Sequence, residues 1–187
     1  MTFILASRSP RRRMLLEQAG LSPDIVPADV DEAPQEGEAP AEYALRVAWA
    51  KAEAVAVDER VVLASDTVVA LDGVSLGKAS DREHASRILH RLSGRSHWVH
   101  TAVVVLGRRS FEEIVSAEVS FRRLSALEIG RYLDTDEPYD KAGAYGIQGH
   151  GGAFVDRLSG SYSAVVGLPM KETLRMLEAA GVERATA

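Results

Sequence analysis

Short apolar runs separated by polar breaks predict how the chain begins. Residues 3–6 are apolar and long enough for a strand, and residues 11–19 have the spacing of a helix. Ser9 is suited to cap this helix, Pro10 to begin it and Gly20 to end it. The chain therefore opens with a strand, a short loop and a helix.

The rest of the chain alternates between strand-like and helical patterns. The acidic segment 29–38 contains proline and glycine and has no regular period, which predicts a mobile surface loop. Strands are expected at residues 24–27, 61–71, 97–106 and 111–122, the last two forming a hairpin. Helices are expected at residues 40–57, with Tyr43, Val47, Ala50 and Ala54 on the apolar face, and at 80–92, 125–133 and 169–181. Capping boxes that start at Ser80 and Ser125 mark the beginning of two of these helices.

These elements predict an α/β fold with a mixed sheet. At 187 residues the chain has the length of one domain, given about 150 residues per domain. We expect a single domain over residues 1–187, with two lobes around a cleft and a frayed tail from about residue 182.

Charge and composition exclude several classes of protein. Acidic residues outnumber basic ones by 27 to 22, and the net charge of −5 disfavours a general nucleic-acid binder. There is no cysteine, which excludes disulfide scaffolds, thiolate zinc sites and cysteine nucleophiles. No apolar run reaches the roughly 18 residues of a membrane span, and the arginines follow the first apolar run, which is the wrong order for a signal peptide. A soluble cytoplasmic protein without a membrane partner is expected.

The first candidate for chemistry is the run of three arginines at residues 11–13, in the first turn of a helix. The N-terminal end of a helix already carries partial positive charge, so positively charged side chains are unfavourable at these positions. Two interpretations remain open: a solvated helix start, or an anion site of the kind that helix N-termini form for phosphate.

Two acidic positions are the second candidate. Asp66 lies in the polar triplet 65–67 within a strand that is otherwise apolar, where a carboxylate needs a partner, a metal ion or an exposed position. Glu32 lies in the acidic segment, and such charge runs are usually only solvated. Structural and functional interpretations are both open for these carboxylates.

Lys51 and Lys78 are the third candidate. Lys51 ends an Ala-rich helix face, and Lys78 follows Gly77 in a loop, so both could equally serve solubility. Only the combination of arginines, carboxylates and lysines indicates phosphoryl chemistry, which requires phosphate charge to be neutralised and a metal to be held.

Familiar catalytic motifs do not account for the remaining residues. The glycine-rich segment 140–152 matches neither the P-loop nor the Rossmann pattern. His97 and His100 are three residues apart on a strand, so they face opposite sides, and no His-Glu-x-x-His motif occurs. No Gly-x-Ser-x-Gly elbow supports a serine nucleophile.

Six ordered blocks carry a family resemblance. They are 5–16 (LASRSPRRRMLL), 31–32 (DE), 65–68 (SDTV), 77–78 (GK), 140–149 (DKAGAYGIQG) and 160–169 (GSYSAVVGLP). Together they resemble the Maf family of nucleoside triphosphate pyrophosphatases, over residues 3 to about 181. The resemblance implies a cytoplasmic enzyme, often dimeric, that hydrolyses a nucleoside triphosphate to the monophosphate and pyrophosphate. The implied fold is elongated and two-lobed, with a deep central groove, and is related to the inosine triphosphate pyrophosphatases.

The resemblance also implies roles for individual residues. Asp66 takes the place of the family's general base or metal partner, and Glu32 that of its second acidic residue, with Mg²⁺, Mn²⁺ or Co²⁺ as the implied cofactor. The phosphate-binding positions correspond to Ser7, Arg12, Lys51 and Lys78.

Three further positions distinguish branches of that family. Arg11, Thr67 and Gln148 match the branch that acts on dTTP and UTP, whereas the branch acting on 7-methyl-GTP has an aromatic residue, Gln and Glu. Two departures are visible: Ala79 stands where proline is common, which loosens the loop of Lys78, and Arg8 replaces a small residue.

Two rival functions belong to other classes. A nucleotide-binding regulator of cell division and septum formation could use the same groove without turnover. Such a protein gains nothing from a carboxylate beside phosphate, because like charges repel, so Asp66 favours a hydrolase. An adaptor for nucleic acid conflicts with the net charge of −5.

Overall fold

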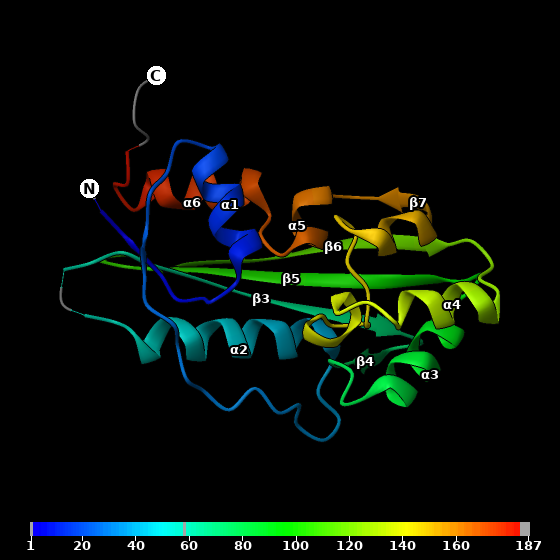
Figure 1. The fold of residues 1–187 in the computed structure, drawn as a ribbon. Coiled ribbons are helices and arrows are strands. Elements are labelled where there is room, and N and C mark those ends of the chain that lie inside the picture. The colour runs from blue at the N-terminus through cyan, green and yellow to red at the C-terminus, as the bar shows by residue number, and fades with distance from the viewer. Residues whose placement is uncertain (1, 58, 184–187) are drawn as a thin grey trace.

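A mixed sheet of seven strands forms the centre of the molecule (Figure 1). The structure is a computed structural model, and it describes residues 2–57 and 59–183. The strand order is β2-β1-β3-β5-β6-β7, and β4 pairs with β3 beside this path. β1 runs parallel to β2 and β3, and all other pairs are antiparallel. The strands are β1 Ile4–Leu5, β2 Asp24–Ile25, β3 Val62–Leu71, β4 Val74–Leu76, β5 Ser96–Leu106, β6 Phe111–Phe121 and β7 Val155–Ser159. The prediction of an α/β fold with a mixed sheet is confirmed.

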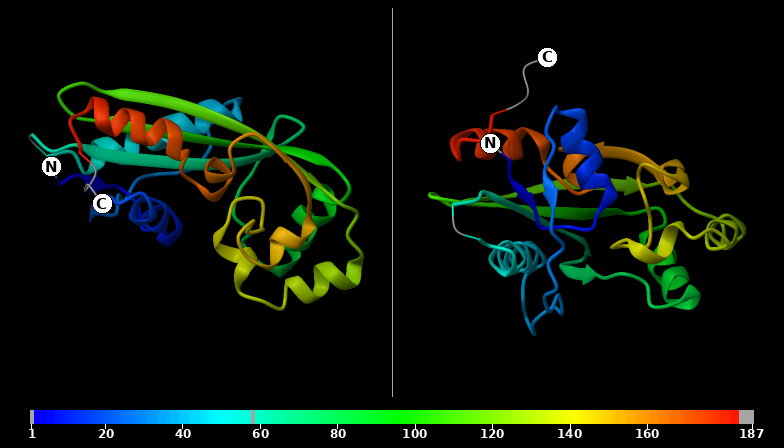
Figure 2. Two further views of the ribbon diagram at one scale, coloured as in Figure 1. Left: turned by 90° about the horizontal axis from the view of Figure 1, so that it is seen from above. Right: turned by 60° about the vertical axis from the view of Figure 1, so that its left-hand side comes forward.

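Helices cover both faces and one end of this sheet. α2 lies on one face, α1, α5 and α6 lie on the other, and α3 and α4 lie together at the far end (Figures 1 and 2). Their bounds are α1 Pro10–Gln18, α2 Pro40–Ala54, α3 Arg82–Leu92, α4 Ala126–Tyr132, α5 Tyr162–Val166 and α6 Met170–Ala179, with short 3₁₀ helices η1 Glu137–Asp140 and η2 His150–Phe154. Within the described ranges, none of the helices has the length and apolar character needed to cross a membrane.

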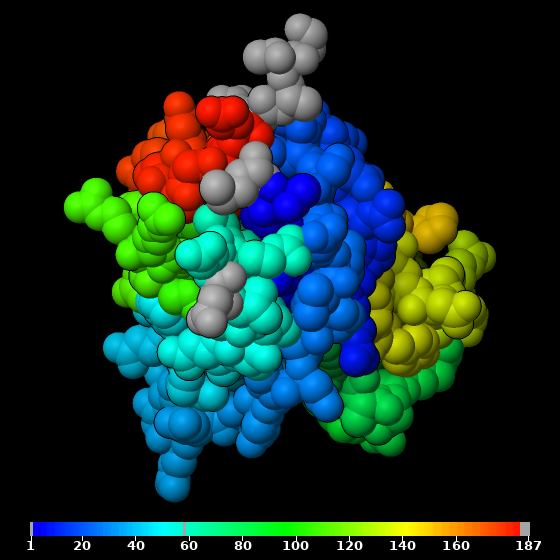
Figure 3. Space-filling view, turned by 90° about the vertical axis from the view of Figure 1, so that its left-hand side faces the viewer, coloured from blue at the N-terminus to red at the C-terminus, as the bar shows by residue number. Residues whose placement is uncertain are grey.

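The alternation of side chains along β3 builds two cores at once. Val62 and Ala64 point toward α2 and pack with its alanines, whereas Leu63 points to the other face and packs with residues of α1 and α6. Figure 3 shows the end of the molecule where the start of the chain, the end of α2 and α6 come together. Because both faces of β3 are buried here, the strand is apolar over most of its length.

A third core lies at the opposite end, between the sheet, α3 and α4. It is rich in aromatic rings: Phe121 contacts both Tyr145 and Phe154 in edge-on geometry, at centroid distances of 4.7 and 5.9 Å. The two ends of the molecule therefore have separate cores, and the long strands β3, β5 and β6 connect them.

Several predicted helix boundaries are confirmed at the level of hydrogen bonds. Ser9 caps α1 by accepting from the backbone N–H of Arg12, Pro10 is its first residue, and Gly20 follows it with φ of 77°. The capping box of α4 forms as predicted between Ser125 and Glu128.

Two details of the predicted helices are wrong. The N-cap of α3 is Asp81, which accepts from His84 N–H at 2.7 Å and lies one residue beyond the expected N-cap Ser80. The buried side of α2 consists of Ala44, Val47, Ala48, Lys51 and Ala52, while Tyr43 and Ala50 are only half-buried and Ala54 is exposed. The true buried side includes a lysine, so it could not be found from apolar residues alone.

The end of the chain also differs from expectation. Pro169 caps α6 instead of opening it, and Val182, placed in the expected tail, is buried and donates its N–H to Leu177 O at 2.9 Å. The remainder of that tail, residues 184–187, lies outside the described residues.

Candidate active site

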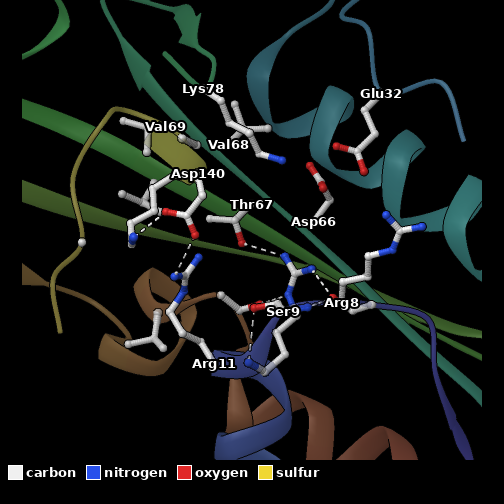
Figure 4. Close-up of a pocket in the computed structure, with 18 of the residues that line it drawn as sticks. Arg8, Ser9, Arg11, Glu32, Asp66, Thr67, Val68, Val69, Lys78 and Asp140 are labelled. Carbon is white, nitrogen blue, oxygen red and sulfur yellow. Dashed lines mark hydrogen bonds and ion pairs between the residues drawn. The ribbon is translucent and has the colours of Figure 1, made fainter. Parts of the chain in front are cut away.

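A groove of about 1040 Å³ opens between the two ends of the molecule. The β1–α1 turn, the acidic segment, the middle of β3 and the glycine-rich segment all contribute to its walls (Figure 4). The structure brings every site residue that the resemblance implies to this groove: Ser7, Arg11, Arg12, Glu32, Lys51, Asp66, Thr67, Lys78 and Gln148. Arg13, the last of the three arginines, instead pairs with Glu17 on the exposed side of α1.

Lys51 joins the two candidate carboxylates. Its Nζ lies 2.7 Å from Asp66 Oδ1 and 2.7 Å from Glu32 Oε1. Burial raises the pKa of Glu32, but the hydrogen bond and the charge of Lys51 outweigh that effect and hold the pKa below its ordinary value. Lys51 is only 8% exposed, so it is not a surface lysine that serves solubility.

Arg12 is a buried cation without a carboxylate partner among the described residues. Its Nε donates to Gly167 O at 2.8 Å, Nη1 to Ser7 Oγ at 3.1 Å, and the third donor, Nη2, lies 3.4 Å from Thr67 Oγ1. Burial lowers its pKa, and Asp66 partly opposes that effect, but guanidinium stays protonated in proteins. All three acceptors are neutral, so this positive charge at the start of α1 is left to attract an anion in the groove.

Thr67 is held between Arg12 and Thr101. The hydroxyls of Thr67 and Thr101 share a hydrogen bond of 3.0 Å, in addition to the contact from Arg12, and Thr101 donates its one proton to Ala164 O at 2.8 Å. Ser65, on the same face of β3, donates to Gly167 O at 3.0 Å. The end of α5 therefore anchors this part of the groove through its carbonyl groups.

The glycine-rich segment brings the opposite wall close to β3. Gly143 has φ of 72°, and a Cβ there would lie 2.9 Å from a methyl group of Val69, so only glycine fits. The neighbouring Ala142 forms a bridge with Lys78, whose exposed side chain extends toward Asp66 in Figure 4.

The two remaining specificity candidates, Arg11 and Gln148, also line the groove. Arg11 Nη1 is 3.7 Å from Asp140 Oδ2, so α1 and η1 face each other across the groove (Figure 4). Gln148 is exposed, and its side chain makes no hydrogen bond within the described part of the chain. Its amide is thus free to donate and accept toward a ligand.

Sequence reasoning gave no role to several residues that line the groove. Arg8 extends toward Glu32 in Figure 4 and adds a cation to the wall that carries Arg12. Glu137 and Tyr145 also line the groove. Glu137 stands only three positions before the recognised block 140–149. An acidic residue so close to a glycine-rich segment was the signal that could have identified it as a groove residue.

The carboxylates allow a simple test of a metal site. No group of three or more His, Cys, Asp or Glu residues suited to a metal occurs within residues 2–57 and 59–183. Asp66 and Glu32 nevertheless lie close together on either side of Lys51, and the second oxygen of each makes no hydrogen bond within the described residues. Two carboxylates completed by substrate phosphates and water are typical of Mg²⁺ sites. The residues present therefore fit a divalent cation that binds together with a phosphate ligand.

Comparison with known proteins agrees with this geometry. The sequence model of a family described as "Maf-like protein" matches residues 2–180. The chain belongs to the Maf family. A curated relative of this Maf protein, the dTTP/UTP pyrophosphatase of Anaeromyxobacter dehalogenans strain 2CP-1, is 52% identical over 95% of this chain and 93% of the relative. The dTTP/UTP pyrophosphatase of Cereibacter sphaeroides is 50% identical over 97% of this chain and 96% of the relative.

Solved structures show a weaker likeness to the Maf chain. The match to a HAM1 protein from Coxiella burnetii covers 66% of this chain and 74% of the HAM1 chain, with a TM-score of 0.47 and 18% sequence identity. The match to a protein from Mycobacterium abscessus, described as a nucleoside-triphosphatase and dITP/XTP pyrophosphatase, covers 67% of this chain and 76% of that protein's chain. Its TM-score is 0.42 and the sequence identity is 20%.

Proposed function

We propose that this Maf-family protein hydrolyses nucleoside triphosphates, preferentially dTTP and UTP, to the monophosphate and pyrophosphate. The observation that carries the proposal is that one groove contains two features. One is the buried guanidinium of Arg12, which has no carboxylate partner among the described residues. The other is the pair of carboxylates, Glu32 and Asp66, that share Lys51. The first arrangement suits a phosphate chain, and the second suits activation of water beside it. Relatives at about half identity that carry the name dTTP/UTP pyrophosphatase support this assignment.

In this proposal, Asp66 accepts the proton of the attacking water. Its side chain is only 13% exposed and is held by Lys51, so the carboxylate has a defined position toward the groove. Water that loses its proton to Asp66 attacks the α-phosphorus, the bond to the bridging oxygen breaks, and pyrophosphate leaves. Arg12, Ser7 and Lys78 bind the phosphate oxygens and offset the charge that develops on the leaving group. Lys51, the fourth phosphate-binding position that the resemblance implies, pairs with Glu32 and Asp66 in this structure and acts on the phosphates only from beside these carboxylates.

Glu32 and Asp66 are the residues that would hold a divalent cation such as Mg²⁺, Mn²⁺ or Co²⁺. A bound cation would neutralise phosphate charge and lower the pKa of water next to it. Lys51 sits between the two carboxylates and keeps them from repelling each other.

Selection of the base is assigned to Arg11, Thr67 and Gln148. The amide of Gln148 can donate and accept at once, which matches the carbonyl and N3–H groups of uracil and thymine. Thr67 is short and tied to Thr101, so it leaves space next to Asp66.

Two other expectations belong to this proposal. We also propose a homodimer and a cytoplasmic location, as the family resemblance implies, which gel filtration and fractionation of cells would test. The rival functions predict something else: a regulator of septum formation would bind nucleotide without turnover, and a nucleic-acid adaptor would bind with steep salt dependence.

An assay of products tests the proposed reaction. The protein is incubated with a panel of nucleoside triphosphates and Mg²⁺, Mn²⁺ or Co²⁺, and both products are identified by chromatography. Monophosphate plus pyrophosphate supports attack at the α-phosphorus. Diphosphate plus phosphate, or binding without turnover under every condition, would overturn the proposal.

A further inference from the structure

One carboxylate at the edge of the groove binds three donors. Glu137 begins η1, and its Oε1 accepts from the hydroxyl of Tyr132 at 2.9 Å and from the N–H of Gly151 at 3.0 Å. Its Oε2 accepts from the N–H of His150 at 2.8 Å. Both oxygens of Glu137 are therefore committed to donors of its own chain.

The same network reaches the start of the turn that carries Gln148. Gly146 N–H donates to the Tyr132 hydroxyl at 3.2 Å, and that hydroxyl donates to Glu137. The turn itself closes through a hydrogen bond from Gly149 N–H to Gly146 O at 3.2 Å. Residues 146–151 are thus attached to Glu137 at both ends, and Gln148 lies in the middle of the attached segment.

The carboxylate packs directly on the backbone of this turn. A Cβ at Gly149 would lie 2.2 Å from Glu137 Oε2, and one at Gly146 would lie 2.9 Å from Oε1. Since the Gln148 side chain makes no hydrogen bond within the described residues, its position depends on its backbone. That backbone in turn depends on Glu137.

The charges in the network suit this arrangement. Burial raises the pKa of Glu137, but the two backbone N–H groups and the Tyr132 hydroxyl outweigh it and hold the pKa below its ordinary value. Burial, together with the neighbouring Glu137, raises the pKa of Tyr132, so its hydroxyl remains a donor. Lys141 Nζ adds a hydrogen bond to the backbone oxygen of Glu137 at 2.7 Å.

We propose that Glu137 is a positioning residue for base selection, which acts by holding the turn 146–151 and thereby the amide of Gln148 in the groove. The inference rests on the proposed function, because it assigns Gln148 to the base of the nucleotide. It adds a residue that does not itself touch the base.

The substitution Glu137→Gln tests this role with minimal change in shape. A carboxamide offers one acceptor oxygen and one NH₂ donor, whereas both carboxylate positions face backbone N–H groups. In either orientation the NH₂ meets an N–H that cannot accept, so one of the two bonds that hold residues 150 and 151 is lost and this end of the turn is loosened. Tyr132→Phe is a second, milder variant that keeps the ring against Phe154 and removes only the hydroxyl.

Glu128→Gln is the matched control. Glu128 also accepts from a backbone N–H, that of Ser125 at 2.9 Å, but it caps α4 away from the groove. Its carboxylate contacts are with Ser125 and Arg122 and not with Tyr132, Glu137 or the turn, so it reports the loss of a capping carboxylate outside the network.

The experiment measures both the turn and the selectivity. Hydrogen–deuterium exchange of the 146–151 amides should rise in Glu137→Gln and Tyr132→Phe and stay unchanged in Glu128→Gln. The ratio of kcat/KM for UTP over GTP should fall about 10-fold or more in Glu137→Gln, the scale of a lost polar match. In a Gln148→Ala background, Glu137→Gln should lower that ratio no further.

Binding of the non-hydrolysable α,β-methylene analogues of UTP and GTP separates this proposal from the proposed function. A wild type that binds the UTP analogue preferentially but hydrolyses neither nucleotide counts against the hydrolase alone. The Glu137 proposal fails if exchange of the turn is unchanged in both variants. It also fails if exchange rises while the UTP preference, in turnover and in binding, stays at the wild-type value.

Discussion

The carboxylate of Asp66 and the ammonium of Lys51 meet at 2.7 Å inside the groove, one on the middle of β3 and the other on the buried side of α2. This ion pair gives Asp66 a defined position, and its second oxygen makes no hydrogen bond within the described residues. The pair therefore leaves one oxygen for water or a cation and makes Asp66 the first residue to test.

Asp66→Asn should abolish most of the activity and leave the fold intact. The amide keeps the size of the side chain and can still accept from Lys51, but it is no longer a base or a cation ligand. We expect kcat to fall by at least the roughly 100-fold typical of acid–base catalysis. Steady-state kinetics and circular dichroism of the same sample decide the matter, and near-normal turnover in a folded variant removes Asp66 from the mechanism.

The two lysines of the groove should differ in what they do for stability. Lys51 is buried between Asp66 and Glu32, whereas Lys78 is exposed. Lys51→Met leaves two close carboxylates without their shared cation, which should lower the free energy of unfolding by about 2 kcal/mol or more. Lys78→Met should lower kcat/KM and change the unfolding free energy by less than about 0.5 kcal/mol.

Urea denaturation and kinetics of both lysine variants check this difference. If both variants lost the same unfolding free energy, the buried ion pair of Lys51 would stabilise the fold no more than the exposed Lys78 does. Full kcat/KM in folded Lys78→Met would remove Lys78 from the phosphate-binding residues.

The parts of the fold that were predictable are those with local causes. The cap of α1 at Ser9 and the capping box at Ser125 depend on hydrogen bonds within a few residues, so the sequence alone indicates them. The hairpin of β5 and β6 follows from two long β-type runs with a short connection. The N-cap of α3 was misplaced because Ser80 and Asp81 are adjacent and equally suited to capping.

The parts that were not predictable depend on distant contacts. β4 and α5 have only 3 and 5 residues, too few for a period to show, and they are held by β3 and by the core. Lys51 could not be recognised as buried because its partners come from the acidic segment and from β3. Family resemblance supplied these site residues, and local pattern alone left each of them ambiguous.

Base preference tests the three specificity positions together. The wild type should prefer dTTP and UTP over dGTP and 7-methyl-GTP by about 100-fold or more in kcat/KM, as expected when buried polar partners are mismatched. Gln148→Glu combined with Thr67→Gln should reduce that preference, because an ionised glutamate accepts only and would face a pyrimidine carbonyl. Equal hydrolysis of 7-methyl-GTP and UTP by the wild type would contradict the assignment of these residues.

The burial of His97 predicts that the folded protein loses stability in mild acid. Its ring is 1% exposed, it shares a hydrogen bond of 2.8 Å between Nε2 and the hydroxyl of Tyr145, and its Nδ1 has no partner among the described residues. Burial lowers the pKa of His97 to about 4. Between that value and the ordinary pKa of about 6.5, the unfolded chain binds the proton and the folded chain does not.

Stability from this residue is therefore complete above pH of about 6.5 and is lost as the pH falls toward 4, by up to about 1.4 kcal/mol per pH unit. His97→Gln removes the titration and keeps a polar group near Tyr145. We expect the unfolding free energy of the wild type, relative to this variant, to fall by about 2 kcal/mol between pH 7.5 and 4.5 in urea denaturation. His100→Gln is the graded control, since His100 is only half-buried and its pKa is lowered by the same cause. A wild-type profile parallel to that of His97→Gln over this range would show that His97 takes up its proton in the folded protein as readily as in the unfolded chain.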